Sequence, residues 1–295
     1  EAGTANPAVQ FDTRLYGGNS FTKTGVGTMV FNTQGDSNMS GDFNVNSGTV
    51  LLNGALSNNS NLSVAAGAIL GGNASYASPA TIAGTISPGS AIGSISTGGS
   101  LTFSDNSTYL ADIIAPDNDR IDVAGDLHIG NNVTLNLSDA TVDGLNAPYI
   151  LLTYSGVRDG AFIPTGVPAG WIVVQDRTLR QVTLEPINLE STEREWLSRH
   201  FTEAELEDPT KEATHWGHAA DPDGDTLSNF FEFAYGSDPK VAGGAQRTVD
   251  GEPGTNNLRS TFVRLRHNLL DYQLQVSSDL DSWATASTTA NTPTV

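Results

Sequence analysis

Six residues between positions 221 and 232 have the types and the spacing of a calcium-binding loop. They are Asp221, Asp223, Asp225, Leu227, Asn229 and Glu232. Counted from Asp221, carboxylates stand at the first, third and fifth positions. A main-chain carbonyl is expected at the seventh position, an amide at the ninth and a carboxylate at the twelfth. Carboxylates converging this closely repel one another unless a cation lies between them. Oxygen ligands favour Ca²⁺ as the cofactor, and an acidic turn without metal is the alternative.

The residues around this loop suggest how it is held. Thr226 occupies the sixth position, where an EF-hand has glycine, and Gly224 stands at the fourth. Upstream, residues 191–206 predict a helix capped by Ser191 or Thr192, with acidic residues in its first turn. The His215-Trp-Gly-His218 stretch raises the alternative of zinc. Two histidines without a third ligand make a weak zinc site, so we prefer a packing role for this stretch.

Residues suited to catalysis are sparse. The chain has no cysteine, and His128 is the only histidine before residue 188, at an outward position between two apolar residues. The common nucleophile triads therefore have no support. One acidic stretch could hold a cation beside a base, and the alternative is a solvated turn. It contains Asp112, Asp117, Asp119, Arg120 and Asp122. We expect no catalytic residues and no enzyme activity.

The charge balance excludes several kinds of partner. The formal net charge is -19, from 33 acidic and 14 basic side chains. Nucleic-acid binding needs a basic face that displaces counterions from phosphates, and anionic membranes attract basic segments. No apolar run approaches the roughly 18 residues of a membrane span. We therefore expect no nucleic-acid partner and no membrane span.

The elements before residue 188 follow a repeat. An aliphatic residue leads through a short step to glycine and then to a run in which apolar residues alternate with polar ones, which predicts strand, turn and strand. The glycines are Gly48, Gly67, Gly84, Gly98 and Gly125. Stacked coils of this kind would form one continuous core, so the pattern predicts a mainly β solenoid. An up-and-down barrel is the alternative, but it would need more two-residue hairpin turns.

Composition divides the chain into four regions. Residues 1–187 are the predicted solenoid with a lead segment, and residues 188–240 are a helical module that carries the calcium loop. Residues 241–255 are rich in glycine and read as a linker. Residues 256–295 contain alternating strands similar to the opening of an Ig-like or fibronectin-like sandwich.

Two families resemble parts of this sequence. Residues 21–31 begin Phe-Thr-Lys-Thr-Gly-Val-Gly, residues 48–54 read Gly-Thr-Val-Leu-Leu-Asn-Gly, and Ser-Pro-Gly-Ser-Ala-Ile-Gly follows at 87–93. This succession resembles the autotransporter-associated β-strand repeat, over roughly residues 20 to 185. The Asp-Pro-Asp-Gly-Asp loop at 221–225, followed by Gly-Ser-Asp-Pro at 236–239, resembles thrombospondin type 3 and dockerin-like calcium modules.

These resemblances imply a fold, a setting and a function. The first implies a right-handed parallel β-helix in a secreted bacterial protein that is extracellular or at the cell surface. We expect a non-enzymatic structural role, as a stalk, adhesin or fibre subunit that self-assembles head to tail through its sheet edges. The expected partners are further copies of the chain or a cell-surface polysaccharide. The alternative is a polysaccharide lyase or hydrolase, or a carbohydrate-binding protein in which Tyr154 and Trp171 stack on sugar.

Overall fold

The computed structural model describes residues 8–33, 37–57, 61–137, 140–243, 247–251, 258–264, 269–273, 275–277 and 281–285. The chain divides into two compact units, Glu1–Ala220 and Asp221–Val295, each described by itself below. The first unit is mainly β and rich in parallel strand pairs, which confirms the predicted fold class at that level. The division between the units falls inside the region 188–240, and the four predicted domain boundaries stay predictions.

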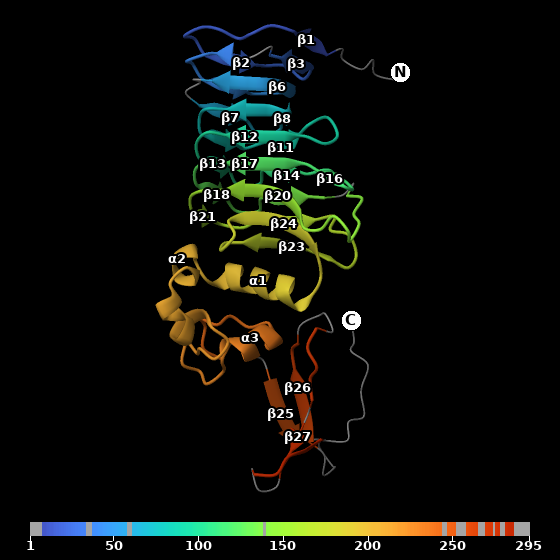
Figure 1. The fold of residues 1–295 in the computed structure, drawn as a ribbon, viewed down its shortest axis with the longest axis vertical. Coiled ribbons are helices and arrows are strands. Elements are labelled where there is room, and N and C mark those ends of the chain that lie inside the picture. Colours follow the sequence, from blue (N-terminus) through green and yellow to red (C-terminus); the bar gives the residue numbers. More distant parts are fainter. Residues whose placement is uncertain are drawn as a thin grey trace. The chain divides into compact units, whose positions relative to one another are not determined.

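Three ladders of stacked strands build the first unit (Figure 1). The seven-stranded sheet contains β2 (Phe21–Lys23), β5 (Phe43–Val45), β7 (Leu62–Val64), β10 (Ala80–Ile82), β13 (Leu101–Phe103), β18 (Leu127–Ile129) and β21 (Arg158–Asp159). The first ladder of the 15-stranded sheet contains β1 (Val9–Phe11), β3 (Thr28–Asn32), β6 (Thr49–Ser57), β8 (Ile69–Gly72), β11 (Thr85–Pro88), β14 (Thr108–Leu110), β19 (Thr134–Asn136) and β22 (Ile163–Thr165). The second ladder contains β4 (Ser37–Asn38), β6, β9 (Ala74–Tyr76), β12 (Ser94–Thr97), β17 (Arg120–Val123), β20 (Tyr149–Tyr154), β24 (Gln181–Pro186) and β23 (Trp171–Asp176). A short hairpin of β15 (Ile113–Ile114) and β16 (Asp117–Asn118) lies between β14 and β17.

The chain visits the ladders in turn, so equivalent positions of successive strands within a ladder come into register. In the seven-stranded sheet Phe43 pairs with Leu62, and Leu62 pairs with Ala80. These three side chains point inward and are buried. The next residue on each strand faces outward: Asn44, Ser63 and Thr81. Stacking of like positions therefore turns the period-two sequence pattern into one continuous apolar core.

The corners of the coils need special residues. Strand β6 passes from the first ladder to the second at Gly54, which has φ +128°, and a Cβ there would lie 1.9 Å from Thr33 Oγ1. At another corner the buried Lys23 donates from Nζ to the carbonyl oxygens of Thr24, Gly25 and Ser47, at 3.0, 2.6 and 3.1 Å. These bonds explain why a lysine precedes glycine in the Thr-Lys-x-Gly sequence.

Two helices cover the sheet edges at β21 and β23. They are α1 (Leu189–His200) and α2 (Glu203–Leu206). Glu195 of α1 accepts the backbone N–H of Gln175 in β23 (2.6 Å), and Glu203 of α2 accepts the backbone N–H of Arg158 in β21 (3.0 Å). Side-chain oxygens thus take the place that a further strand would occupy, which blocks strand addition at these two positions.

The beginning of α1 differs from the sequence prediction. Asn188 is the N-cap, and its side chain accepts the N–H of Ser191, which is the third helical residue and bonds back to Asn188. The prediction of Ser191 or Thr192 as the cap was wrong because Asn188 forms this reciprocal capping box one turn earlier. Two short turns complete the first unit: η1 (Pro209–Lys211) and η2 (Glu212–Trp216).

In its described residues, the second unit combines one helix with two strand pairs. They are α3 (Asn229–Tyr235), the antiparallel pair β25 (Arg247–Gly251) with β26 (Leu258–Phe262), and the antiparallel pair β27 (Gln275–Val276) with β28 (Ala284–Thr285). Strand β25 lies within the stretch expected to be a linker. Helix α3 ends at Gly236, which takes the left-handed conformation at φ +69°. Among all the described residues, no helix combines the length and the apolar character needed to cross a membrane.

Candidate metal centre

Three of the predicted metal ligands converge in the loop before α3. One carboxylate oxygen each from Asp221, Asp223 and Asp225 lies within 4.8 Å of the other two, and all three residues are partly buried. It is the one group of at least three potential metal-ligating side chains in the described part of the chain. The sequence spacing therefore brings its three carboxylates together.

Backbone hydrogen bonds fix the path of this loop. Asp221 accepts the N–H groups of Gly224 and Thr226, both at 2.9 Å. Gly224 and Thr226 both have left-handed backbones, with φ +75° and +79°. A non-glycine residue in that region costs about 1–2 kcal/mol. The loop is therefore held by its own carboxylates in a conformation that Thr226 does not favour.

Glu232 and Asn229 stand on the first turn of α3, and both are buried. Glu232 Oε1 accepts a hydrogen bond from Ser237 Oγ at 3.2 Å, whereas Oε2 has no hydrogen-bond partner within the described ranges. The pKa of Glu232 is raised to about 7. Burial is the main cause, and the nearby carboxylates, Asp223 first among them, add to it. A fully buried carboxylate oxygen without a donor is the situation that a cation relieves.

Asp223 shows the same lack of a counter-charge. Its Oδ2 is buried without a hydrogen-bond partner in the described structure, while its Oδ1 accepts the N–H of Asp225 at 3.1 Å. Burial, with Asp225 and Asp221 nearby, raises the pKa of Asp223 above its ordinary value. The two orphan oxygens, on Asp223 and Glu232, therefore belong to groups that interact electrostatically.

Sequence reasoning missed three features of this loop. Gly243 donates its N–H to Asp225 Oδ2 at 2.7 Å, so the chain after α3 is tied to the loop. The hydroxyl of Ser237 supports Glu232. The N–H of Leu227 donates to Asp225 Oδ1 at 2.8 Å, and the role of its carbonyl as a ligand stays a prediction. Of these three contacts, only the one made by Ser237 had a signal in the sequence, the Gly-Ser-Asp-Pro stretch after α3.

The other candidate ligands belong to the first unit and have partners within it. His218 bonds through Nε2 to Glu193, and His215 bonds through Nδ1 to the hydroxyl of Thr214. In the acidic stretch near β16, Asp119 is buried and Arg120 pairs with Asp122 at 2.7 Å. Neither group forms a converging set of ligands.

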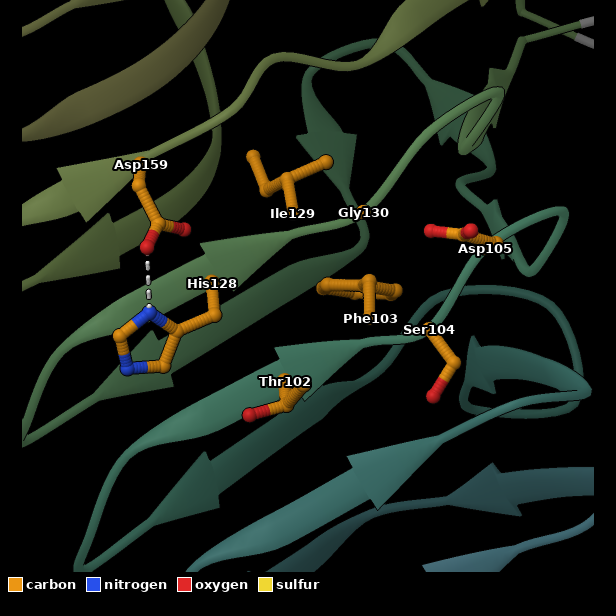
Figure 2. Close-up of a pocket in the computed structure, with 8 residues that line it drawn as sticks. All are labelled: Thr102, Phe103, Ser104, Asp105, His128, Ile129, Gly130 and Asp159. Carbon is orange, nitrogen blue, oxygen red and sulfur yellow. Dashed lines mark hydrogen bonds and ion pairs between the residues drawn. The ribbon is translucent and has the colours of Figure 1, made fainter.

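A shallow groove of about 560 Å³ lies on the seven-stranded sheet. Figure 2 shows its polar side: His128 Nδ1 bonds to Asp159 Oδ2 at 2.9 Å, with Thr102 on the neighbouring strand. His128 faces outward as predicted. The residues proposed to stack on sugar are not in this groove. Tyr154 is buried against Glu203, and Trp171 packs on Tyr149 with ring centroids 5.7 Å apart.

Comparison with models of known protein families finds no match to this chain, and comparison with curated proteins finds none either.

Proposed function

We propose that the protein is a non-enzymatic, extracellular structural protein of bacterial origin, a stalk, adhesin or fibre subunit stabilised by calcium. The first unit is proposed to be a right-handed parallel β-helix of the autotransporter-associated repeat type. The second contains a thrombospondin type 3 or dockerin-like calcium loop. The stacked parallel ladders and the resemblance of residues 20 to 185 support the first part. A rigid stack suits a protein that spans distance rather than one that encloses a substrate.

The observation that carries the proposal is the buried, unsatisfied carboxylate pair at the metal centre. Three aspartates converge within 4.8 Å, and Glu232 keeps an oxygen without a donor in the described structure although it is fully buried. Carboxylate and amide oxygens are hard ligands, which suit Ca²⁺ in a flexible loop of this length. Binding would neutralise the repulsion and join the loop to α3.

Calcium titration tests this proposal directly. Calorimetry on the calcium-free full chain should show one site, and hydrogen exchange should show protection of residues 221–240 on addition of Ca²⁺. Replacing Asp223 by asparagine should remove both signals, because the loop loses a charged ligand. Replacing Asp271 by asparagine is the control, since this aspartate of the second unit is exposed and outside the loop.

Two results would contradict the calcium assignment. One is the absence of binding heat and of protection in the native chain. The other is an equal loss in the Asp223→Asn and Asp271→Asn variants, which would show a diffuse effect of charge. Chelation should leave the unfolding of the first unit unchanged, because binding energy stabilises only the part that holds the ion.

The proposed partners are a cell-surface polysaccharide or further copies of the chain. Electron micrographs of the native protein with calcium would show fibres if it polymerises and single particles if it does not. Head-to-tail pairing of sheet edges is restricted by one observation: side chains of α1 and α2 accept the edge N–H groups of Gln175 and Arg158.

Carbohydrate processing is the second candidate, and the groove of Figure 2 is the observation that favours it. Asp159 orients His128 through Nδ1, so the other ring nitrogen is available as a base. A turnover assay on acidic and neutral polysaccharides, with calcium present, tests this candidate. Activity that His128→Gln abolishes without lowering thermal stability would support an enzyme and overturn the structural proposal.

A further inference from the structure

One outward column of the first ladder consists entirely of β-branched residues. It runs through seven consecutive, registered strands. Its members are Thr28, Thr49, Ile69, Thr85, Thr108, Thr134 and Ile163. The two isoleucines are 38% and 49% exposed, and the inward residue that follows each member from Thr49 to Thr134 belongs to the core. We refer to these seven residues as the threonine column.

The surface beside the threonine column carries no charge. Two residues further along the same strands lie Val30, Leu51, Gly71, Ser87, Leu110, Asn136 and Thr165. None of the fourteen residues in the two columns is ionisable, although 16% of the chain is charged. The face therefore offers methyl and hydroxyl groups on a parallel sheet and nothing that would attract a charged ligand.

The hydroxyls of the threonine column make no hydrogen bonds within the described part of the chain. None of its five threonines has a side-chain hydrogen bond to another described residue. On each of the other two faces, a pair of outward neighbours does bond side chain to side chain. Ser63 donates to Asn44 at 2.6 Å on the seven-stranded sheet, and Thr153 donates to Asp122 at 2.6 Å on the second ladder. The threonine column therefore presents five unengaged hydroxyls at positions set by the strand spacing.

That spacing matches a lattice of tetrahedral water. Neighbouring strands lie about 4.8 Å apart. An O–H···O distance of about 2.75 Å places second neighbours in a tetrahedral network about 4.5 Å apart, and it gives a layer repeat of about 7.3 Å. Outward residues along one strand lie about 6.7 Å apart. Over the six spacings of the threonine column the axial mismatch adds up to about 2 Å, less than half of one repeat.

We propose that this face binds ice. A rigid sheet holds the hydroxyls in place before binding, so contact with an ordered water lattice costs little conformational entropy. The methyl groups of threonine and isoleucine exclude mobile water between the columns. The inference concerns the first unit alone and does not depend on the calcium site.

Other occupants fit this face less well. The two columns cover about 400 Å², about half of the 800 Å² per partner that a stable protein interface requires. A nucleic acid or an acidic polysaccharide would need cations, and neither column has one. The columns also have no aromatic ring on which a single sugar chain could stack.

The test compares two double substitutions with the same chemistry on different faces. Thr85→Lys with Thr108→Lys changes two neighbours in the centre of the threonine column. Ser75→Lys with Ser96→Lys changes two registered neighbours that face outward on the second ladder. Microscopy of single ice crystals in solutions of the full chain measures ice shaping, and partition into slowly growing ice measures binding. Thermal melting of each variant checks that the fold is kept.

We expect the native chain and the Ser75/Ser96 variant to shape ice, and the Thr85/Thr108 variant to lose this activity. Substituting valine at Thr85 and Thr108 should weaken shaping less than lysine does, because valine keeps the methyl groups. No ice shaping by the native chain would overturn the proposal, and so would an equal loss in both lysine variants. Binding to crystalline neutral polysaccharide without ice shaping, lost with Thr85/Thr108, would assign this face to that polymer instead.

Discussion

Replacing Glu203 by alanine should loosen α2 from the sheet edge at β21 and destabilise the first unit. The Glu203 carboxylate accepts three bonds: from Arg177 Nη1 at 2.7 Å, from the Arg158 N–H at 3.0 Å and from the Tyr154 hydroxyl at 3.2 Å. Burial acts to raise the pKa of Glu203, but the N–H groups and Arg177 outweigh it and hold the pKa below its ordinary value. The ionised carboxylate is therefore the form that binds α2 to the sheet edge.

The size of the expected stability loss follows from the burial of the ion pair between Arg177 and Glu203. The side chains of Arg177 and Glu203 are 13% and 7% exposed. Removing one partner of a buried pair costs about 3–5 kcal/mol, because the other charge stays buried. The substitution also leaves the N–H of Arg158 without its acceptor. Because this N–H belongs to the same network, we count the cost of losing its hydrogen bond within that range and do not add it. For a unit of this size, the loss corresponds to a fall in melting temperature of roughly 10 °C.

Urea unfolding followed by far-ultraviolet circular dichroism measures this loss. Glu207→Ala is the matched control, since Glu207 follows α2 and pairs with Arg180 while 44% exposed. An exposed pair contributes about 0–1 kcal/mol, so the control should unfold almost like the native chain. A Glu203→Ala variant that unfolds within about 1 kcal/mol of this control would refute the view that α2 closes the edge by a buried ionic contact.

Three further predictions concern the first unit. Burial raises the pKa of Asp119 to about 7, above its unfolded value, so the protonated form favours folding. Stability should fall as the pH rises from about 4 to 7, and the slope should flatten in Asp119→Asn. Gly160→Ala should destabilise more than Gly170→Ala in thermal melts: both have left-handed backbones, but only at Gly160 would a Cβ collide with a carbonyl, at 1.8 Å. Lys23→Met should cost about 1–3 kcal/mol in denaturant titrations, because three corner carbonyls lose their donor. No change in that titration would show that water replaces the lysine.

The strands of the first unit were predictable because their information is local. Apolar residues alternate on each short strand, and glycine marks the corners, so Val45-Asn-Ser-Gly48 followed by Val50 already predicts strand, turn and strand. The mainly β fold with stacked parallel strands follows from the repetition of that unit. The antiparallel pairing of β23 with β24 breaks the repeat, and the repeat itself gives no sign of it.

The closure of the sheet edges could not be predicted, because its contacts are polar and distant in sequence. On a helix over residues 191–206, Trp196 and Leu197 are the kind of large apolar residues that are expected on the buried face. The buried face also includes Glu195 and Ser198, and Glu195 bonds to Gln175 about twenty residues away. A glutamate on a helix is normally expected to be exposed to solvent, so no sequence pattern predicts that it accepts the N–H of an edge strand.

The metal centre also has one part that the sequence predicts and one part that it does not. The alternate aspartates are a local pattern, and the structure brings Asp221, Asp223 and Asp225 together. The complete burial of Glu232 depends on how α3 packs within the second unit, and spacing alone carries no information on burial. Thr226 shows the limit most clearly, since its side chain gives no sign of the left-handed backbone that the loop requires.

The polar contacts at β21 and β23 determine how the first unit ends, but they do not determine how long its stack of strands is. Glu195 and Glu203 bond to the edge strands β23 and β21, while the strands stacked before them repeat the same inward positions. Asn61 and Pro79 occupy equivalent places, because their carbonyls accept from the first residues of adjacent strands, Phe43 and Leu62. Excision of residues 62–79 would therefore let β10 pair directly with β5. Such a change shortens the stack by about 4.8 Å and leaves its closed end untouched. Duplication or loss of one coil in the gene is thus a ready route to proteins of different reach with the same terminus.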